Sequence, residues 1–405
     1  RNDDNMSYQP DKSYELSGKV QIDTKRQSEL LSPDGSAMFC MDTLGNAYVM
    51  DVDAGTCIWK IEPNKLKDYS DGKFYWIAPM SDTQGVLVSQ NEIRILDWKK
   101  QKVVSVIERQ EEEKNYSDFT FAISGNTLGV TNSLTAWVND LQQKVCTHQI
   151  SYEADKTFSS VGGVLFNDDC SELLVYGSDP VRNDRTESKG IVKISLADEK
   201  VTCISDLNAE DIVYAGEHLV AAVQWEPVGE IAAVMDEKPL ADYFVAVYDT
   251  QSGEMVWTSD RYEIQAVSRP CTIQLFEENT DEEKGELLLV SLKDRLLCMQ
   301  PDTGEVMGVQ TYSGDIVGVR QRDAGRYLIG LEDGRTYLFT SDNQMASDFR
   351  VGEIDYKTGG ILFGERADVL IQTAEDGRTL TVSRPLWDDT MQELQRTKAY
   401  GQVEY

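Results

Sequence analysis

The side chains that most often carry out catalysis or bind metals are few and scattered in this chain. His148 and His218 are its only histidines, seventy positions apart. A zinc site or an acid–base pair built on histidine would need nearly every histidine, together with partners from elsewhere. His148 lies within an alternating strand pattern, so we expect it on a sheet surface rather than in an active centre.

The seven cysteines also lack the spacing of a metal or redox site. None are adjacent and no Cys-x-x-Cys occurs, which argues against zinc ligands and thioredoxin-like chemistry. Most fall within apolar strand patterns, where a thiol behaves as a small hydrophobic group. The scattered set favours unpaired thiols and a reducing, cytoplasmic compartment, with an exported or membrane-tethered domain as the alternative. The cysteines are Cys40, Cys57, Cys146, Cys170, Cys203, Cys271 and Cys298.

Carboxylates are too numerous to mark a site by themselves. Asp168-Asp169 and Asp281-Glu282-Glu283 offer oxygen ligands for Ca²⁺, but neither has the alternating spacing of a dedicated calcium loop. We expect both to be solvated acidic loops. We therefore assign no catalytic, metal-binding or cofactor-binding residue, and we expect no cofactor.

Composition and charge restrict the class of partner. The formal net charge of −31 over 405 residues repels phosphate backbones, which argues against nucleic-acid binding. The same charge favours basic partners. Hydrophobic residues at 40% and aromatics at 9% are enough for a substantial core. The chain has no apolar run of 18 residues, so we expect no direct insertion into a membrane.

A repeated sequence motif indicates the fold class. Its clearest copies run from Asp51 to Trp59 and from Asp249 to Trp257; in both, Asp precedes a Gly by four positions and Trp follows it by four. The side chain of an Asp accepts hydrogen bonds from the backbone N–H groups that follow it and so closes such a turn. Gly tolerates the positive φ that the turn requires. We place the equivalent of that Gly in the other copies at Gly18, Gln101, Gln143, Glu199, Gly304 and Asn343 or Gln344.

Each turn joins two alternating hydrophobic strands, and two further strands precede it. Four antiparallel strands per unit of roughly 40 to 55 residues are typical of β-propeller blades. The sequence therefore predicts an all-β chain with a single propeller of eight blades. Seven blades are the alternative if the copy near Gln344 is misplaced.

The first and last copies are incomplete in complementary ways. The segment from Tyr14 to Ile22 offers only an outermost strand, and the last copy lacks one. Pairing Val20 and Ile22 with a strand near 379–382 would complete one blade and remove an exposed edge. We expect an N-terminal leader at residues 1–13, the propeller at 14–385 and a tail at 386–405. Because the chain starts with Arg1 instead of Met, we also expect it to be one part of a longer protein.

The Asp–Gly–Trp spacing resembles the quinoprotein-like repeat, in which the Trp packs between neighbouring blades. Trp59 and Trp257 match it fully, so the resemblance implies that both are structural residues between blades. The neighbouring WD-repeat superfamily is also similar, since the turn Ser32-Pro33-Asp34-Gly35 is like its blade openings. Quinone-dependent enzymes of the first family use adjacent cysteines, which this chain lacks. Elsewhere the Trp position holds Ile22, Ser105, Thr147, Cys203 and Gly308.

Three aromatic residues are the candidates for partner contacts. Tyr75 and Trp76 belong to the first-strand segment Phe74-Tyr75-Trp76-Ile77, and consecutive aromatics cannot all face one side of a strand. Trp225 ends an apolar run and begins a loop. Aromatic side chains on propeller loops favour a protein- or peptide-binding scaffold without catalysis. The alternatives are an enzyme or small-molecule sensor that uses carboxylates at the channel mouth, and an exported propeller resembling outer-membrane assembly lipoproteins.

Overall fold

The part of the chain that the structure describes is folded almost entirely into antiparallel sheets. The computed structural model describes residues 8–21, 30–63, 72–115, 118–152, 160–178, 190–228, 240–265, 271–278, 284–332, 336–341, 349–352, 361–363, 370–373 and 376–385. It divides into two compact units, residues 1–90, 94–105 and 310–405 and residues 91–93 and 106–309. In this described part, no helix is long and apolar enough to cross a membrane.

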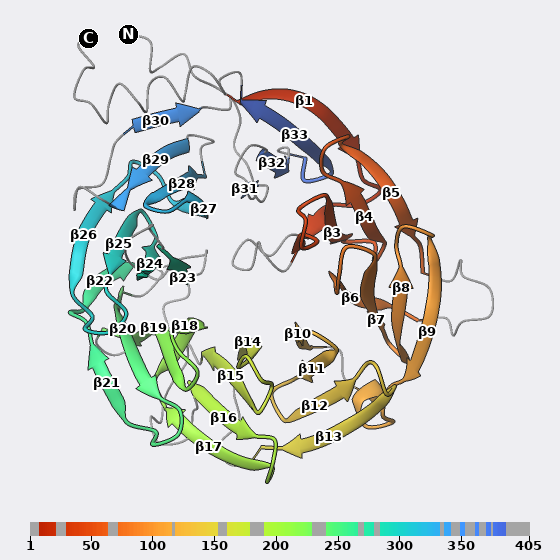
Figure 1. Cartoon of the computed structure of the whole chain (residues 1–405), viewed down its shortest axis with the longest axis horizontal. Coiled ribbons are helices and arrows are strands. Elements are labelled where there is room, and N and C mark those ends of the chain that lie inside the picture. Colours follow the sequence, from red (N-terminus) through yellow and green to blue (C-terminus); the bar gives the residue numbers. More distant parts are fainter. Residues whose placement is uncertain are drawn as a thin grey trace. The chain divides into compact units, whose positions relative to one another are not determined.

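Four sheets lie wholly or mostly in the first unit (Figure 1). Each is an antiparallel array of four strands, in the orders β2-β3-β4-β5, β6-β7-β8-β9, β27-β28-β29-β30 and β1-β33-β32-β31. The strands are β1 (Tyr8–Glu15), β2 (Val20–Gln21), β3 (Ala37–Asp42), β4 (Ala47–Asp51), β5 (Thr56–Ile61), β6 (Phe74–Pro79), β7 (Gln84–Ser89), β8 (Glu92–Asp97), β9 (Lys102–Glu108), β27 (Ile316–Asp323), β28 (Arg326–Leu331), β29 (Thr336–Thr340), β30 (Phe349–Gly352), β31 (Ile361–Phe363), β32 (Leu370–Thr373) and β33 (Thr379–Pro385).

The second unit holds the other four sheets, in the orders β10-β11-β12-β13, β14-β15-β16-β17, β18-β19-β20-β21 with β22 also on β20, and β23-β24-β25-β26. A short 3₁₀ turn, η3 (Glu113–Asn115), precedes them. The strands are β10 (Thr120–Ser124), β11 (Thr127–Thr131), β12 (Thr135–Asp140), β13 (Val145–Ser151), β14 (Ser160–Phe166), β15 (Glu172–Ser178), β16 (Ile191–Ser195), β17 (Lys200–Ser205), β18 (Asn208–Tyr214), β19 (Leu219–Pro227), β20 (Leu240–Asp249), β21 (Met255–Thr258), β22 (Tyr262–Gln265), β23 (Thr272–Glu277), β24 (Glu286–Leu292), β25 (Arg295–Met299) and β26 (Val306–Thr311).

The predicted four-strand unit is therefore confirmed in eight sheets. Its central strands are buried on both faces, as in β15, where Leu173 and Leu174 are both inaccessible. The core lies between adjacent sheets: Val138 of β12 shares one cluster with Leu173 and Val175 of β15. Apolar side chains on both faces of a sheet require a neighbouring sheet on each side.

The turn between the third and fourth strands depends on a residue with positive φ. Gly55 and Gly253 have φ of 63° and 75° there, a region that glycine enters without steric cost. In the second copy, Oδ1 of Asp249 accepts the backbone N–H groups of Gln251 and Ser252 at 2.8 and 3.1 Å. The turn predicted from the Asp–Gly spacing is confirmed.

One turn lies a residue later than predicted. We placed it at Gln143 with Asn139 as the capping residue, but the positive φ of 60° belongs to Lys144. Asp140, not Asn139, accepts the N–H of Gln143, at 2.9 Å. Asn139 and Asp140 are adjacent and both suit a turn, so the spacing of the repeat by itself could not identify which of them caps this one. The copy at Asn343 or Gln344 lies outside the described residues.

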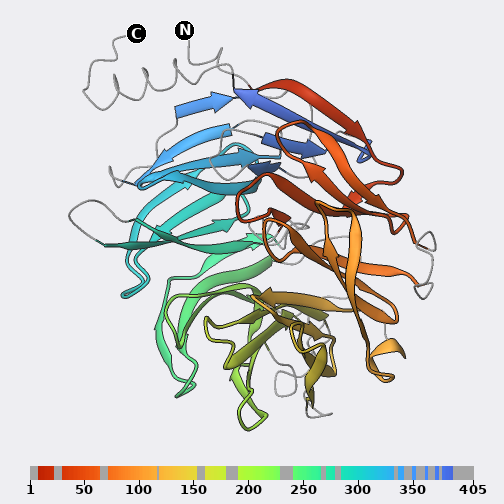
Figure 2. The same ribbon diagram turned by 45° about the vertical axis from the view of Figure 1, so that its right-hand side comes forward.

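The two ends of the chain share one sheet. β1 pairs antiparallel with β33, from Tyr8 opposite Pro385 to Glu15 opposite Thr379. The two strands lie side by side in Figures 1 and 2. The predicted pairing of an N-terminal strand with the C-terminal sheet is thus confirmed, and its strand begins at Tyr8, ahead of the boundary that we placed at residue 14. The predicted tail, 386–405, lies outside the described residues.

The residues in that terminal pair differ from the prediction. Val20 and Gln21 form β2, the first strand of the next sheet, and pair with β3 instead of β33. Ile22 lies outside the described residues. Gly18 is not a turn between a third and a fourth strand, because it lies between β1 and β2. Its N–H donates to Oδ2 of Asp42 at 3.1 Å. An alternating apolar pattern looks the same in a first and a fourth strand, so periodicity could not tell them apart.

From its charges, the segment 109–115 is expected to be a surface loop; residues 110–112 are exposed, but Arg109 and Glu113 are buried. Nε of Arg109 donates to Oε1 of Glu113 at 2.8 Å, and both side chains are buried. The guanidinium also lies 4.5 Å from the ring centroid of Phe119. Burial raises the pKa of Glu113, although Arg109 opposes the shift. Opposite charges in a run can pair in the interior, which a count of charges does not reveal.

A buried carboxylate fixes the turn between β3 and β4 to the segment after β1. Asp42 accepts hydrogen bonds from the N–H groups of Gly18 at 3.1 Å and Asn46 at 3.0 Å, and from the Tyr48 hydroxyl at 2.6 Å. Burial by itself would raise the pKa of Asp42. The hydrogen bonds from Tyr48 and Asn46 outweigh burial, so its pKa is lowered.

This carboxylate should make stability depend on pH in the acid range. The folded pKa of Asp42 lies below its unfolded value of about 3.9, so its contribution is present above pH ~4 and is lost as the pH falls through the folded pKa. We expect Asp42→Asn to lose less free energy of unfolding than the parent between pH 5 and pH 3, measured by urea denaturation. Asp53→Asn, at an exposed position of the next turn, is the control. Parallel pH curves for the parent and Asp42→Asn would contradict the assignment.

Candidate protein-interaction surfaces

A β-bulge presents the predicted aromatic pair on β6. Phe74 pairs with Ser89 and Trp76 pairs with Val88, so Tyr75 is an extra residue on the bulged strand. Phe74 is buried in the core, whereas Tyr75 and Trp76 are half-buried. A bulge rotates the strand and redirects its side chains. Both predicted contact residues therefore keep accessible surface at a rigid position in a sheet.

The sheet β18–β22 carries an extension that the other sheets lack. β19 and β20 remain paired from Leu219 opposite Asp249 to Pro227 opposite Ala241, and β22 covers the far end of β20 as a fifth strand. We call Trp225–Val228, Leu240–Tyr243 and β22 together the β19–β20 extension. The sequence analysis missed it, although the alternation in Tyr262-Glu263-Ile264-Gln265 is a strand signal.

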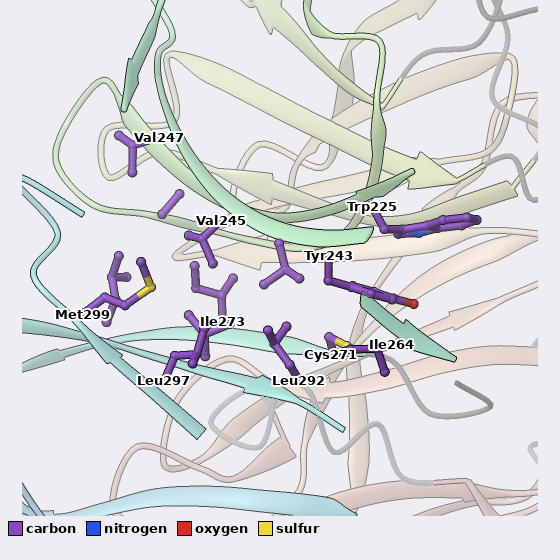
Figure 3. Packing of buried hydrophobic residues seen from close by; sticks show 14 of the residues in the cluster. Trp225, Tyr243, Val245, Val247, Ile264, Cys271, Ile273, Leu292, Leu297 and Met299 are labelled. Carbon is purple, nitrogen blue, oxygen red and sulfur yellow. The ribbon is translucent and has the colours of Figure 1, made fainter. Parts of the chain in front are cut away.

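Trp225 supports this extension from within. Its side chain is 6% exposed and stacks on Tyr243 at a centroid distance of 6.3 Å and an angle of 28°. Figure 3 shows the pair at one end of a cluster that also contains Ile264 and Cys271. We expected Trp225 at the start of a loop; it instead lies inside a longer strand, where it pairs with Tyr243 and shares a buried cluster with Ile264 and Ile273. Its Nε1 donates to no acceptor in the described part of the chain.

The tip of the extension is apolar and its side is held by an ion pair. Val228 and Leu240 are exposed, and the N–H of Val228 donates to the carbonyl of Leu240 at 3.0 Å. Nη1 of Arg261 donates to Oε2 of Glu226 at 2.6 Å, and its guanidinium lies 4.5 Å from the ring of Phe244. The ion pair and the backbone hydrogen bond thus stabilise the extension, which carries two exposed aliphatic side chains.

Trp59 and Trp257 occupy equivalent positions on fourth strands. Trp59 pairs with Val49 and Trp257 with Val247, and in each strand the preceding residue is an unpaired bulge. Both rings are half-buried rather than fully buried. Trp59 packs against a cluster that includes Trp98 of the following sheet. The equivalence predicted from the repeat is confirmed.

Trp257 joins two sheets of the second unit directly. Its Nε1 donates to the carbonyl oxygen of Pro301 at 2.8 Å. Its ring lies so close to Gly304 that a Cβ there would collide with it. Pro301 and Gly304 belong to the turn between β25 and β26, so the Trp binds the turn of the next sheet.

The same contact recurs where no Trp is present. His148 follows an unpaired bulge residue in β13, and its Nδ1 lies 3.0 Å from Oε1 of Glu199, the positive-φ residue of the next turn. In the first unit, a Cβ on Gly55 would collide with Lys12 of β1. In the fourth copy of the repeat, the predicted equivalent of the Trp is Thr147; with the turn at Lys144, the equivalent residue is His148.

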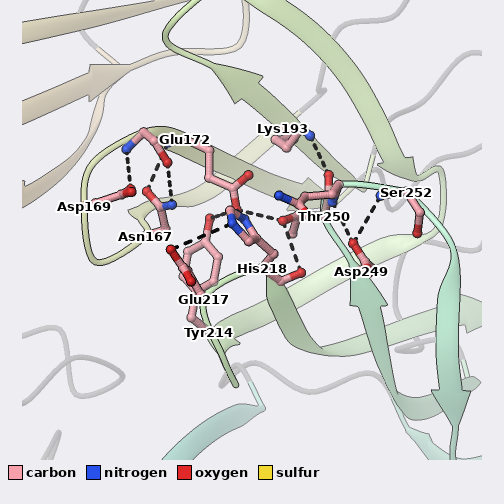
Figure 4. A network of polar contacts seen from close by, with 12 residues as sticks. Asn167, Asp169, Glu172, Lys193, Tyr214, Glu217, His218, Asp249, Thr250 and Ser252 are labelled. Atoms are coloured by element: carbon pink, nitrogen blue, oxygen red, sulfur yellow. Dashed lines mark hydrogen bonds and ion pairs between the residues drawn. The ribbon is translucent and has the colours of Figure 1, made fainter.

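A polar network joins β15 to the following sheet, and it is the arrangement that most resembles a reactive centre (Figure 4). The buried carboxylate of Glu172 accepts the hydroxyls of Thr250 at 2.7 Å and Tyr214 at 3.1 Å. Nδ1 of His218 lies 3.6 Å from it. Burial, and next the charge of Glu172, raise the pKa of Tyr214. Both of these hydroxyls donate to the carboxylate, so this network fastens two sheets.

The described residues do not favour carboxylate or metal chemistry elsewhere. Among them, no three His, Cys, Asp or Glu side chains are arranged to hold a metal ion. Glu113 has a raised pKa, but it is paired with Arg109. Asp169 accepts the N–H of Ser171 at 2.9 Å, a turn-closing contact. All seven cysteines are thiols.

No protein-family model and no curated protein matches the chain. Solved structures match its fold. The Dos1 propeller superposes with a TM-score of 0.61 at 10% identity, over 93% of this chain and 95% of that one. The computationally designed Ika8 protein gives 0.56 at 11% identity, over 93% and 98%, and the C-terminal WD40 domain of Sif2 gives 0.53 at 9%, over 93% and 98%. The chain therefore has a WD-repeat-like β-propeller fold.

Trp257 should contribute strongly to stability. Trp257→Ala removes a half-buried ring and leaves a cavity, so we expect a loss of about 3 kcal/mol in the free energy of unfolding. Trp257→Phe loses chiefly the bond to Pro301 and should cost about 1 kcal/mol. Denaturant midpoints of both variants and of Trp59→Ala check this. Equal, near-zero effects would contradict the contact.

Glu172 should also contribute strongly to the free energy of unfolding. Glu172→Ala leaves two buried hydroxyls without their acceptor, so we expect a loss of about 2–3 kcal/mol. Glu217→Ala is the matched control, because Glu217 is an exposed neighbour 4.0 Å from His218 and should cost less than about 1 kcal/mol. Chemical denaturation measures both. A control as damaging as Glu172→Ala would show that the network is not the cause.

Proposed function

We propose that this chain is a non-catalytic β-propeller that binds another protein or a peptide, as a scaffold module of a longer protein. The distribution of its exposed apolar side chains carries the proposal. Seven of the eleven large hydrophobic residues exposed in the described chain lie on fourth strands: Val104 and Val106 on β9, Val145 on β13, Met255 and Val256 on β21, and Val306 and Val309 on β26.

These seven residues are exposed apolar side chains on outer strands, apart from those that form the core. A monomer gains nothing from apolar side chains in water, whereas exposed apolar patches on rigid strands are typical of interaction sites. The tip of the β19–β20 extension adds Val228 and Leu240. Tyr75 and Trp76 add half-buried aromatic surface at the β6 bulge. We keep these two aromatics as proposed contacts; Trp225, being buried, would act by supporting the extension.

The charge of the chain points to the kind of partner. With a net charge of −31, the surface should attract basic proteins and repel nucleic acids. We also infer that the repeat is quinoprotein-like in detail. This inference rests on the Asp51–Trp59 and Asp249–Trp257 copies and on the equivalent placement of their Trp residues.

Selection of random displayed peptides against the whole protein tests the proposal. We expect enrichment of basic peptides whose affinity falls between 0.1 M and 1 M salt, because the Debye length shrinks from about 10 Å to about 3 Å. For peptides that bind at the β6 bulge, Trp76→Ala should weaken binding about tenfold. Leu44→Ala, at an exposed position of the β3–β4 turn, is the control.

Two results would contradict the binding role. One is a selection that enriches nothing beyond an unrelated acidic protein treated in parallel. The other is a set of peptides whose affinity does not change with salt.

A further inference from the structure

We propose that β26 is a docking edge, where an extended basic segment of a partner adds as a further strand to the sheet β23–β26. The inference rests on the proposed binding function and gives it a place and a partner class. β26 is the last strand of its sheet and has no strand on its outer side in the described chain. The outer N–H and C=O groups of such a strand are a template for pairing.

β26 lacks the charged residues and prolines that discourage such pairing, and it is longer than β21, the other fourth strand without a titratable residue. Charged residues, Pro or bulges on an edge strand discourage the addition of another chain. β21 has only four residues and a bulge at Val256. β26, Val-Met-Gly-Val-Gln-Thr, has six residues without a charge or a Pro. The remaining fourth strands each contain a charged or titratable residue: Lys12 in β1, Lys60 in β5, Lys102 in β9, His148 in β13, Lys200 in β17 and Arg350 in β30.

Exposed apolar side chains continue from β26 to the neighbouring β21. Val306 and Val309 are exposed on β26, and Met255 and Val256 on β21. Trp257 connects the two strands, because it binds the turn that precedes β26. A partner strand on β26 would therefore find aliphatic contacts on both sheets.

The charges around this surface select a basic partner. Residues 249–265 and 299–311 contain six carboxylates, Asp249, Glu254, Asp260, Glu263, Asp302 and Glu305, and one basic residue, Arg261. Arg261 is already paired with Glu226 at 2.6 Å. All but Asp249 of these carboxylates are exposed. Lysine or arginine side chains of an incoming strand would meet these carboxylates on one face of the sheet, while its aliphatic side chains contact the exposed valine on the other face.

A strand places alternate side chains on opposite faces, so the partner should alternate basic and aliphatic residues. The probe is a synthetic lysine–valine alternating peptide, with its glutamate–valine counterpart as the charge control. Binding to the whole protein is followed by fluorescence anisotropy. We expect the first peptide to bind in a salt-sensitive manner and the second not to bind.

Val309→Lys places a charge on the edge, where it repels the peptide and blocks pairing. We expect it to weaken binding at least tenfold. Val145→Lys makes the same substitution on β13, where Val145 is 44% exposed against 49% for Val309, and should change affinity less than twofold. Both sites are half in solvent, so both variants should fold, which circular dichroism checks. A peptide N-methylated at alternate residues, which cannot donate on one edge, should lose binding.

The inference is overturned by any of three results. The N-methylated peptide binds as well as the parent peptide, which would exclude strand pairing. Val145→Lys weakens binding as much as Val309→Lys, which would indicate net charge alone. The lysine–valine peptide does not bind at all. None of these results touches the displayed-peptide selection, so the proposed function stands or fails separately.

Discussion

The contact that a fourth strand makes with the turn of the next sheet is the constraint on which the described sheets depend. A bulge turns one residue of the fourth strand toward its neighbour, and that residue binds the turn where φ is positive. Trp257 does so through a hydrogen bond to Pro301, and His148 through Glu199. The groups in contact differ, since the indole ring of Trp257 lies against Gly304 and the imidazole of His148 lies against the carboxylate of Glu199. The position of the contact in the repeat is the same. Because a sheet buried on both faces is stable only against its neighbours, such contacts convert separate hairpins into one array.

Buried polar groups reinforce the same junctions. Glu172 of β15 holds Tyr214 and Thr250 of the next sheet, and Oδ2 of Asp211 in β18 accepts the N–H of Ile273 in β23 at 3.0 Å. Hydrogen bonds to buried carboxylates are strong only when every lone pair is satisfied. These groups therefore fix the order and spacing of sheets more than they add chemistry. Among the described carboxylates, Glu113, whose pKa burial raises, is likewise held inside the protein by its pairing with Arg109.

Function, on this basis, follows from what the sheets leave exposed. The strands are rigid because their core faces are fully packed, so aliphatic side chains on outer strands are held in fixed positions against water. A preorganised surface loses little entropy when a partner binds. In the proposed binding role, the strong negative charge would act on partner choice and association rate more than on the fold.

Repeat spacing alone indicated the fold class, eight sheets with seven as the alternative, the pairing of an N-terminal strand with the C-terminal sheet, and the equivalence of Trp59 with Trp257. These depend on local chemistry, because alternation, turn residues and a fixed period are written in neighbouring positions. Tertiary structure decided what depends on distant partners. It assigned Val20 to a first strand, paired Arg109 with Glu113, moved the turn predicted at Gln143 to Lys144, and buried Trp225 within an extended strand. A strand pattern specifies which side chains face inward, but not which sheet will cover them, and the covering sheet is what separates a buried residue from a binding one.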